Sequence, residues 1–196
     1  MLFGVCRRID MIANGIQEVY YIQRIEESLA NSIGVPKLKS GPHIIRDDRG
    51  WRQDEKSIEY IWVILVDRHF VGRGGLITAK FNEHTFRGRS HPEELVQGVF
   101  SIGADHLIQE FYQEKADRHA DQVIDCFQLD LFNANKGIRL DGVSYRIHIM
   151  SNNIDTVVCV ANPVTQHWRK WEAEIQKLAT KLAANSGSRE LIKLFN

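Results

Sequence analysis

One almost wholly apolar stretch decides the fold: Ile58-Glu59-Tyr60-Ile61-Trp62-Val63-Ile64-Leu65-Val66, which stops at Asp67-Arg68-His69. Its β-branched and aromatic residues, bounded by turn residues, predict a strand that is covered on both faces. A glycine-rich segment leads to residues 76–81, where successive side chains alternate in character as on a second strand. We therefore expect a hairpin at the centre of a sheet.

Outward from this hairpin, apolar residues recur at helical spacing in three parts of the chain. The first helix is predicted over residues 16–33, where Gly34 and Pro36 end it. Ser90-His91-Pro92-Glu93 matches a capping box and predicts a second helix, kinked near Gly103 and continuing over residues 104–127 as the longest helix of the chain. A third helix is expected after Asn162-Pro163, with Trp168 and Trp171 on its apolar stripe.

Further strands are predicted where the period is two, over residues 126–132, 142–150 and 154–161. Residues 43–46 and 51–53 flank a turn and fit either a short edge hairpin or a surface loop. The sequence thus predicts one α+β domain over residues 1–196, with a mainly antiparallel sheet of about five strands and three principal helices packed mostly on one face. The predicted order is helix, two strands, helix, three strands, helix, and residues 186–196 are expected to form a short helix or a flexible tail.

Composition places the chain among ordinary globular proteins. It has 196 residues, of which 43% are hydrophobic and 26% are charged. No apolar run approaches the roughly 18 residues that a membrane span needs, so no membrane partner is expected. Three widely spaced cysteines, Cys6, Cys126 and Cys159, indicate reduced thiols and a cytoplasmic location, and their spacing fits no zinc motif. We predict no metal and no cofactor.

Charge is balanced overall but segregated along the chain. The 25 basic and 25 acidic residues cancel, yet residues 36–90 hold eleven basic and seven acidic groups, whereas residues 91–142 hold four and ten. Such asymmetry is compatible with a basic binding surface, or with an acidic solvated face on one helix. A protein that neutralises many phosphates of duplex DNA is usually basic overall, so duplex DNA is not the expected ligand.

Arginines around the hairpin are the first candidate site. We expect an anion or nucleic-acid surface there, made by Arg68, Arg73, Lys80, Arg87 and Arg89. Arginine binds phosphate through two parallel hydrogen bonds, and nearby glycines let backbone N–H groups approach the same anion. Because a hairpin would separate the first pair of arginines from the last by some 20 Å, an extended polyanion fits better than a small anion. The alternative is that these are solvated turn residues paired with neighbouring carboxylates.

A second candidate is acid–base or metal chemistry by Asp67, His69, His84 and His91. Histidine and aspartate are common metal ligands, but this spacing matches no closed metal motif. Arg146 and His148 stand on the outward side of the strand 142–150, where an open sheet face could bind a ligand. No nucleophile elbow, Walker loop or dinucleotide fingerprint is present in the sequence.

The sequence therefore favours a non-enzymatic cytoplasmic binding or interaction protein, whose ligand is RNA, another nucleic acid or an acidic protein partner. The alternative is a metal-assisted phosphoesterase or nuclease that uses Asp67 and the nearby histidines. These two hypotheses differ in whether carboxylates and imidazoles converge within roughly 5 Å on one open site. A symmetric homodimer, joined through an edge strand or the tryptophan helix, is compatible with either.

Overall fold

The central hairpin is present as predicted. The computed structural model describes residues 20–47, 50–82, 84–86, 89–116 and 142–196, with only the backbone described within 42–56 and 84–91. Strand β2 (Gly50–Arg68) pairs antiparallel with β3 (Gly72–Phe81), and Val63 lies opposite Ile77. Ile61 and Ile64, which point to opposite faces of β2, are both fully buried. The apolar run is therefore covered on both faces.

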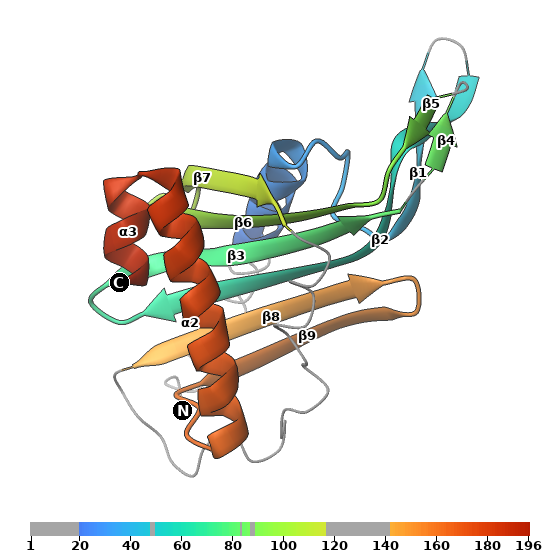
Figure 1. Cartoon of the computed structure of the whole chain (residues 1–196). Coiled ribbons are helices and arrows are strands. Elements are labelled where there is room, and N and C mark those ends of the chain that lie inside the picture. Colours follow the sequence, from blue (N-terminus) through green and yellow to red (C-terminus); the bar gives the residue numbers. More distant parts are fainter. Residues whose placement is uncertain (1–19, 48–49, 83, 87–88, 117–141) are drawn as a thin grey trace, which may run out of the picture.

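Around this hairpin the described chain builds one antiparallel sheet with the order β7-β6-β3-β2-β8-β9, and β1 pairs with the first half of β2 (Figure 1). The sheet thus has seven strands, where about five were predicted. The remaining strands are β1 (Gly41–Asp47), β6 (Glu94–Ile102), β7 (Ile108–Lys115), β8 (Val143–Ser151) and β9 (Ile154–Ala161), and β4 (His84–Phe86) pairs with β5 (Arg89–His91) in a separate ribbon.

Several predicted elements are confirmed. The strands expected over residues 142–150 and 154–161 are β8 and β9. The edge hairpin is formed by β1 and the start of β2, with Arg46 opposite Trp51. Residues 20–32 form the predicted first helix, and α2 (Gln166–Ser186) is the predicted tryptophan helix. Its N-cap is Thr165, three residues later than the predicted Asn162.

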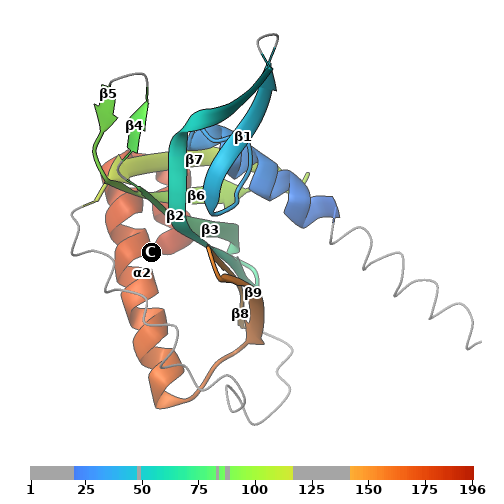
Figure 2. The same ribbon diagram turned by 90° about the vertical axis from the view of Figure 1, so that its right-hand side faces the viewer.

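Helices cover both faces of the sheet. Figures 1 and 2 show α2 and α3 (Arg189–Phe195) on one face and the helix 20–32 on the other. Because β2 exposes alternate side chains to each side, Trp62 packs with α2 in one core and Ile61 packs with Leu29 of the first helix in a second core. Helices packed mostly on one face were predicted, and the first helix departs from that arrangement.

The prediction of a helix from residue 90 through residue 127 is wrong for all the residues of this range that the structure describes. Its first half is β6 and its next part is β7. In β6 every residue from Leu95 to Ile102 is buried, because the strand lies inside the sheet and both of its faces are covered. Such a strand is apolar almost throughout, and its sequence also satisfies a helical period. The remainder of the predicted helix and the strand predicted over 126–132 lie outside the described residues.

The C-terminal segment is packed helix rather than a flexible tail. Ser188 caps α3 by accepting a hydrogen bond from the backbone N–H of Leu191 at 3.1 Å. Leu191 and Phe195 are 1% and 2% exposed and contribute to the core under α2. The prediction of a flexible tail over 186–196 is therefore wrong, and the alternative of a short helix is confirmed. Trp168 and Trp171 are also core residues, so they provide no exposed surface for a dimer.

Candidate functional site

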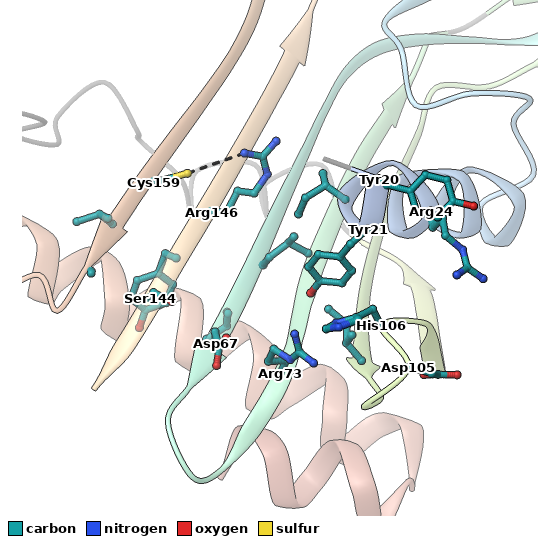
Figure 3. Close-up of a pocket in the computed structure, with 17 residues that line it drawn as sticks. Tyr20, Tyr21, Arg24, Asp67, Arg73, Asp105, His106, Ser144, Arg146 and Cys159 are labelled. Atoms are coloured by element: carbon teal, nitrogen blue, oxygen red, sulfur yellow. Dashed lines mark hydrogen bonds between the residues drawn. The ribbon is translucent and has the colours of Figure 1, made fainter. Parts of the chain in front are cut away.

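A cavity of about 790 Å³ lies on the face of the sheet that carries the helix 20–32, beside the β2–β3 hairpin (Figure 3). We call it the tyrosine–arginine cavity. Its polar and aromatic lining comes from the first helix, four strands and the turn before β7: Tyr20, Tyr21, Arg24, Asp67, Arg73, Asp105, His106, Ser144, Arg146 and Cys159. Its volume falls within the range of about 300–1,000 Å³ that small-molecule sites occupy.

Strand register explains why these side chains meet. Asp67 of β2 lies opposite Arg73 of β3 on one side and opposite Ser144 of β8 on the other. Residues directly opposite each other in antiparallel strands point to the same face of the sheet. Two residues along β8, Arg146 lies opposite Cys159 of β9. The floor of the cavity is therefore a row of side chains that crosses four adjacent strands.

Three guanidinium groups give the cavity its character. Arg73 lies over the ring of Tyr21 with its Cζ 5.7 Å from the ring centroid, and Arg24 lies 5.9 Å from that of Tyr20. The Nη1 atom of Arg146 is 3.9 Å from the Sγ atom of Cys159. Within the described part of the chain, none of the three arginines forms an ion pair with a carboxylate. No carboxylate among the described residues therefore neutralises these charges by direct pairing.

Two aspartates moderate this positive charge. Asp67 is exposed at the hairpin end of the floor, and Asp105 accepts a hydrogen bond from the backbone N–H of Leu107 at 3.2 Å. With three arginines and two aspartates, the formal charge of the cavity lining is +1 when histidine is neutral. His106 contributes an aromatic surface, since its ring centroid is 4.6 Å from that of Tyr21. The cavity is thus weakly cationic and partly aromatic.

Of the predicted arginines, Arg73 faces this cavity and Arg68 does not. Arg68 donates from Nη1 to the backbone carbonyl of Leu194 at 3.2 Å and hydrogen-bonds the side chain of Gln176. Both partners belong to the C-terminal helices on the opposite face of the sheet. The two hairpin arginines therefore cannot contact the same ligand, and Arg68 holds α3 in place.

Lys80 is engaged by two carboxylates. Its Nζ atom lies 2.8 Å from Oε1 of Glu93 and 3.0 Å from Oε2 of Glu59. The hydrogen bond to Glu93 is the main cause of an elevated pKa for Lys80, and the Glu59 carboxylate adds to it against the opposing effect of burial. A lysine with two anionic partners has little charge to offer a polyanion.

Of the last two predicted arginines, the structure describes only the backbone of Arg89. Arg89 lies in β5 opposite Phe86, and Arg87 lies outside the described residues. Between Arg73 and Phe81, β3 advances eight residues, which corresponds to about 26 Å at 3.3 Å per residue. Because β4 follows Phe81, the distance predicted between the two ends of the hairpin is present in the fold.

The acidic and histidine candidates are also spread along the hairpin. His84 and His91 lie opposite each other in the β4–β5 ribbon. Asp67, near the end of β2, and His69, in the turn after it, lie at the opposite end of the β2–β3 hairpin. The ring of His69 packs edge-on against Phe70, with centroids 4.1 Å apart. Across the described ranges, no group of three histidine, cysteine, aspartate or glutamate side chains is arranged to hold a metal ion.

The glycines beside Arg73 allow neighbouring residues to pack closely against β3. Gly74 and Gly75 are buried positions of β3 and do not form an open loop. A Cβ atom on Gly75 would overlap the carbonyl oxygen of Ile64 and the ring of Phe100. A Cβ atom on Gly74 would overlap the side chain of Leu194. The close approach of these neighbours explains the glycine pair, which the sequence had indicated as part of an anion-binding loop.

Sequence reasoning found Arg146 but missed the contribution of the first helix. Tyr20, Tyr21 and Arg24 fall within the helix predicted over residues 16–33, and none of the three was predicted as a site residue. Their only signal was a pair of large aromatic residues beside an arginine one turn later. These residues can be recognised as part of a site only once the helix is known to lie over β2 and β8. That packing joins distant segments of the chain, so local sequence does not reveal it.

His148 attaches this helix to the sheet. Its Nδ1 atom lies 2.8 Å from Oε1 of Glu26 in the first helix, and its Nε2 atom lies 2.9 Å from Oδ1 of Asp155 in β9. The Glu26 carboxylate is the main cause of a raised pKa for His148, Asp155 adds to it, and burial opposes it. The outward face that the sequence predicted for β8 is thus covered here by the helix.

Comparison with known proteins found no match: no protein-family model, no curated protein and no solved structure matches this chain. Among the helices of the described residues, none is long and apolar enough to cross a membrane. The chemistry of the tyrosine–arginine cavity is therefore the basis for a functional proposal.

Proposed function

We propose that the protein is a non-enzymatic binding protein for single-stranded nucleic acid, and that the tyrosine–arginine cavity is its ligand site. One observation carries the proposal: two tyrosines line the same cavity as three arginines, none of which pairs with a carboxylate of the described residues. Arg24, Arg73 and Arg146 come from three different elements, so the fold itself assembles them.

Phosphate is the ligand group that suits these arginines. A guanidinium group presents a planar set of donors that matches two phosphate oxygens, and it keeps its charge at all physiological pH values. Arg73 and Arg24 are each placed over a tyrosine ring, which restricts how many conformations the guanidinium group can adopt. A partly ordered arginine loses less entropy when a phosphate binds.

The tyrosines favour a nucleic acid over a simple anion. Unpaired bases stack on aromatic side chains, and this contact tolerates any base because every base has a π face. Tyr20 is 63% exposed and stands at the cavity with its ring accessible. A duplex, whose bases are paired and stacked, cannot use such a ring in the same way. The proposal is therefore for a single strand.

A titration of fluorescent oligonucleotides tests the proposal. The anisotropy of single-stranded RNA, single-stranded DNA and duplex DNA would be followed at about 50 and 200 mM salt for wild type and for Arg73→Ala. We expect single strands to bind, with an affinity that falls as salt rises. Loss of one phosphate contact in Arg73→Ala should reduce the slope of log K against log salt by about 0.7.

Arg169→Ala is the matched control, because it removes the same charge from an exposed position on α2. Its salt slope should equal that of wild type. Absence of single-strand binding at low salt would contradict the proposal, and the acidic protein partner would then be the ligand class to pursue for the same arginines. Incubation with Mg²⁺ or Mn²⁺ should leave the bound oligonucleotide intact, whereas cleavage would favour the nuclease alternative.

A further inference from the structure

The turn between β2 and β3 presents an aromatic ring to solvent beside the cavity. Phe70 is 94% exposed, and the adjacent Val71 is 52% exposed. Single exposed apolar residues are common on protein surfaces and need no explanation by themselves. At Phe70, however, a second feature accompanies the exposure.

Phe70 has a backbone φ of 64°, which lies in the left-handed region. A bulky residue rarely adopts this conformation, because its Cβ atom crowds the following carbonyl oxygen. Glycine or asparagine would adopt it at lower cost. The turn therefore keeps a phenylalanine where its conformation is unfavourable and its ring gains nothing from burial. Positions with such costs concentrate at functional sites.

The turn is also held firmly. The backbone N–H of Val71 donates to the carbonyl of Arg68 at 3.1 Å, and the backbone N–H of His69 donates to the carbonyl of Gly142 at 3.0 Å. The second bond joins the turn to the start of β8. The ring of His69 contacts the ring of Phe70 edge-on. Phe70 is thus a ring on a fixed support, with a second aromatic ring beside it.

The position of this ring relates it to the tyrosine–arginine cavity. Asp67 and Arg73 face each other at the base of the hairpin and line the cavity, and Phe70 is three residues from each. At about 3.3 Å per residue the Cα atom of Phe70 lies at most about 10 Å beyond the hairpin base. Stacked nucleotides advance about 3.4 Å each, so two or three of them span that distance.

We propose that Phe70, supported by His69, is a stacking platform for one unpaired base of a nucleic-acid strand whose phosphates lie in the cavity. This inference rests on the proposed function and adds a second contact point outside the cavity. A nucleobase suits the size of the platform, because the apolar surface consists of one ring and one valine. A stable protein interface needs about 800 Å² on each partner, far more than these two side chains provide.

The test uses two oligonucleotides of equal length, oligo-dT and the same backbone without bases. Phe70→Ala should weaken oligo-dT binding by about 5- to 150-fold, the range for one lost stacking contact, and should leave binding of the abasic strand unchanged. Phe70→Trp should restore oligo-dT affinity. Phe70→Asn removes the ring but accepts the left-handed backbone, so it should behave like Phe70→Ala with the turn preserved.

The outcomes separate this inference from the proposed function. Unchanged oligo-dT affinity in Phe70→Ala, together with the loss expected in Arg73→Ala, would overturn the platform and leave the cavity proposal standing. Equal losses for oligo-dT and the abasic strand would also overturn the platform, because the contact would not involve a base. If wild type bound neither strand but bound phosphatidylserine vesicles in a Phe70-dependent manner, both proposals would fail and the ring would belong to a membrane contact.

Discussion

Two arginines five residues apart have different roles because a strand alternates its faces. Arg68, at the end of β2, points toward α2 and α3 and bonds the carbonyl of Leu194. Arg73, at the start of β3, lies opposite Asp67 and points into the cavity. The sequence predicted that both would belong to one anion-binding surface. At the scale of single residues, side-chain direction decides which of the two arginines reaches the cavity.

This difference predicts that one substitution changes stability and the other changes ligand binding. Arg68→Ala should lower the free energy of unfolding by about 1.5–3 kcal/mol, since it removes charged hydrogen bonds that hold α3, and should leave the tyrosine–arginine cavity intact. Arg73→Ala should change stability by no more than about 0.5 kcal/mol, as is usual for a residue outside the core, but should weaken ligand binding. Urea denaturation and oligonucleotide titration of both variants measure the two effects. Equal stability losses would contradict the assignment of Arg68 to structure.

A second residue-scale prediction concerns pH. The pKa of His148 is raised in the folded state by Glu26 first and by Asp155 in addition. A raised folded-state pKa gives stability that is present in full below the unfolded value of about 6.5 and is lost as pH rises through the folded value. His148→Gln should therefore destabilise the protein more at about pH 6 than at a pH above the raised folded-state pKa of His148, where the imidazole is neutral.

The size of this effect should stay within about 1 kcal/mol for each ion pair, because Asp155 is largely exposed and Glu26 is partly exposed. Denaturant unfolding of wild type and variant across that pH range measures it. A difference that did not change with pH would show that His148 contributes through packing or neutral hydrogen bonds alone.

At the scale of elements, β2 and β3 were predictable because their sequence allowed one interpretation. The run at residues 58–66 is too short for a buried helix of ordinary length and is rich in β-branched residues. β6 was not predictable in the same way. Leu95, Val96, Val99 and Phe100 satisfy a helical stripe, and their burial on both faces depends on β7 and on two layers of helix that the local sequence does not reveal.

The last helix gives an element-scale prediction. Leu191 is 1% exposed in the core between α3 and α2. Leu191→Ala should lower the free energy of unfolding by about 2–5 kcal/mol through lost burial and the cavity left behind. Lys193→Ala is the matched control on the exposed side of the same helix, and its effect should stay within about 0.5 kcal/mol. Equal and small effects would mean that residues 189–195 behave as a tail.

For the whole molecule, the sequence supported the class of fold but not the position of the ligand site. Alternating and continuous apolar segments were sufficient to predict an antiparallel α+β protein. The tyrosine–arginine cavity instead needs Tyr21, Arg73 and Arg146 to come together from positions about 50 to 125 residues apart in the chain. Of these three residues, the sequence indicated Arg73 and Arg146 as candidates. The pairing of β2 with β8 that brings them together could not be inferred from local patterns.

The same scale explains why we propose the cavity, and not the hairpin arginines taken together, as the ligand site. Along β3, Arg73 lies about 26 Å from Phe81 at the far end of the strand, and two carboxylates already balance the charge of Lys80. Across the strands, neighbouring side chains on one face are close enough to contact a single nucleotide. The proposed ligand site therefore runs across the strands of the sheet and not along the hairpin.

Cys159 allows the location of the ligand to be measured directly. Its thiol is exposed and lines the tyrosine–arginine cavity beside Arg146. The rate of its alkylation by iodoacetamide would be followed by peptide-resolved mass spectrometry, with and without single-stranded oligonucleotide. At about ten times the dissociation constant, a ligand in the cavity should slow alkylation of Cys159 about tenfold, in proportion to the free fraction. An unchanged rate at Cys159, under conditions where anisotropy shows the oligonucleotide to be bound, would contradict the cavity as the ligand site.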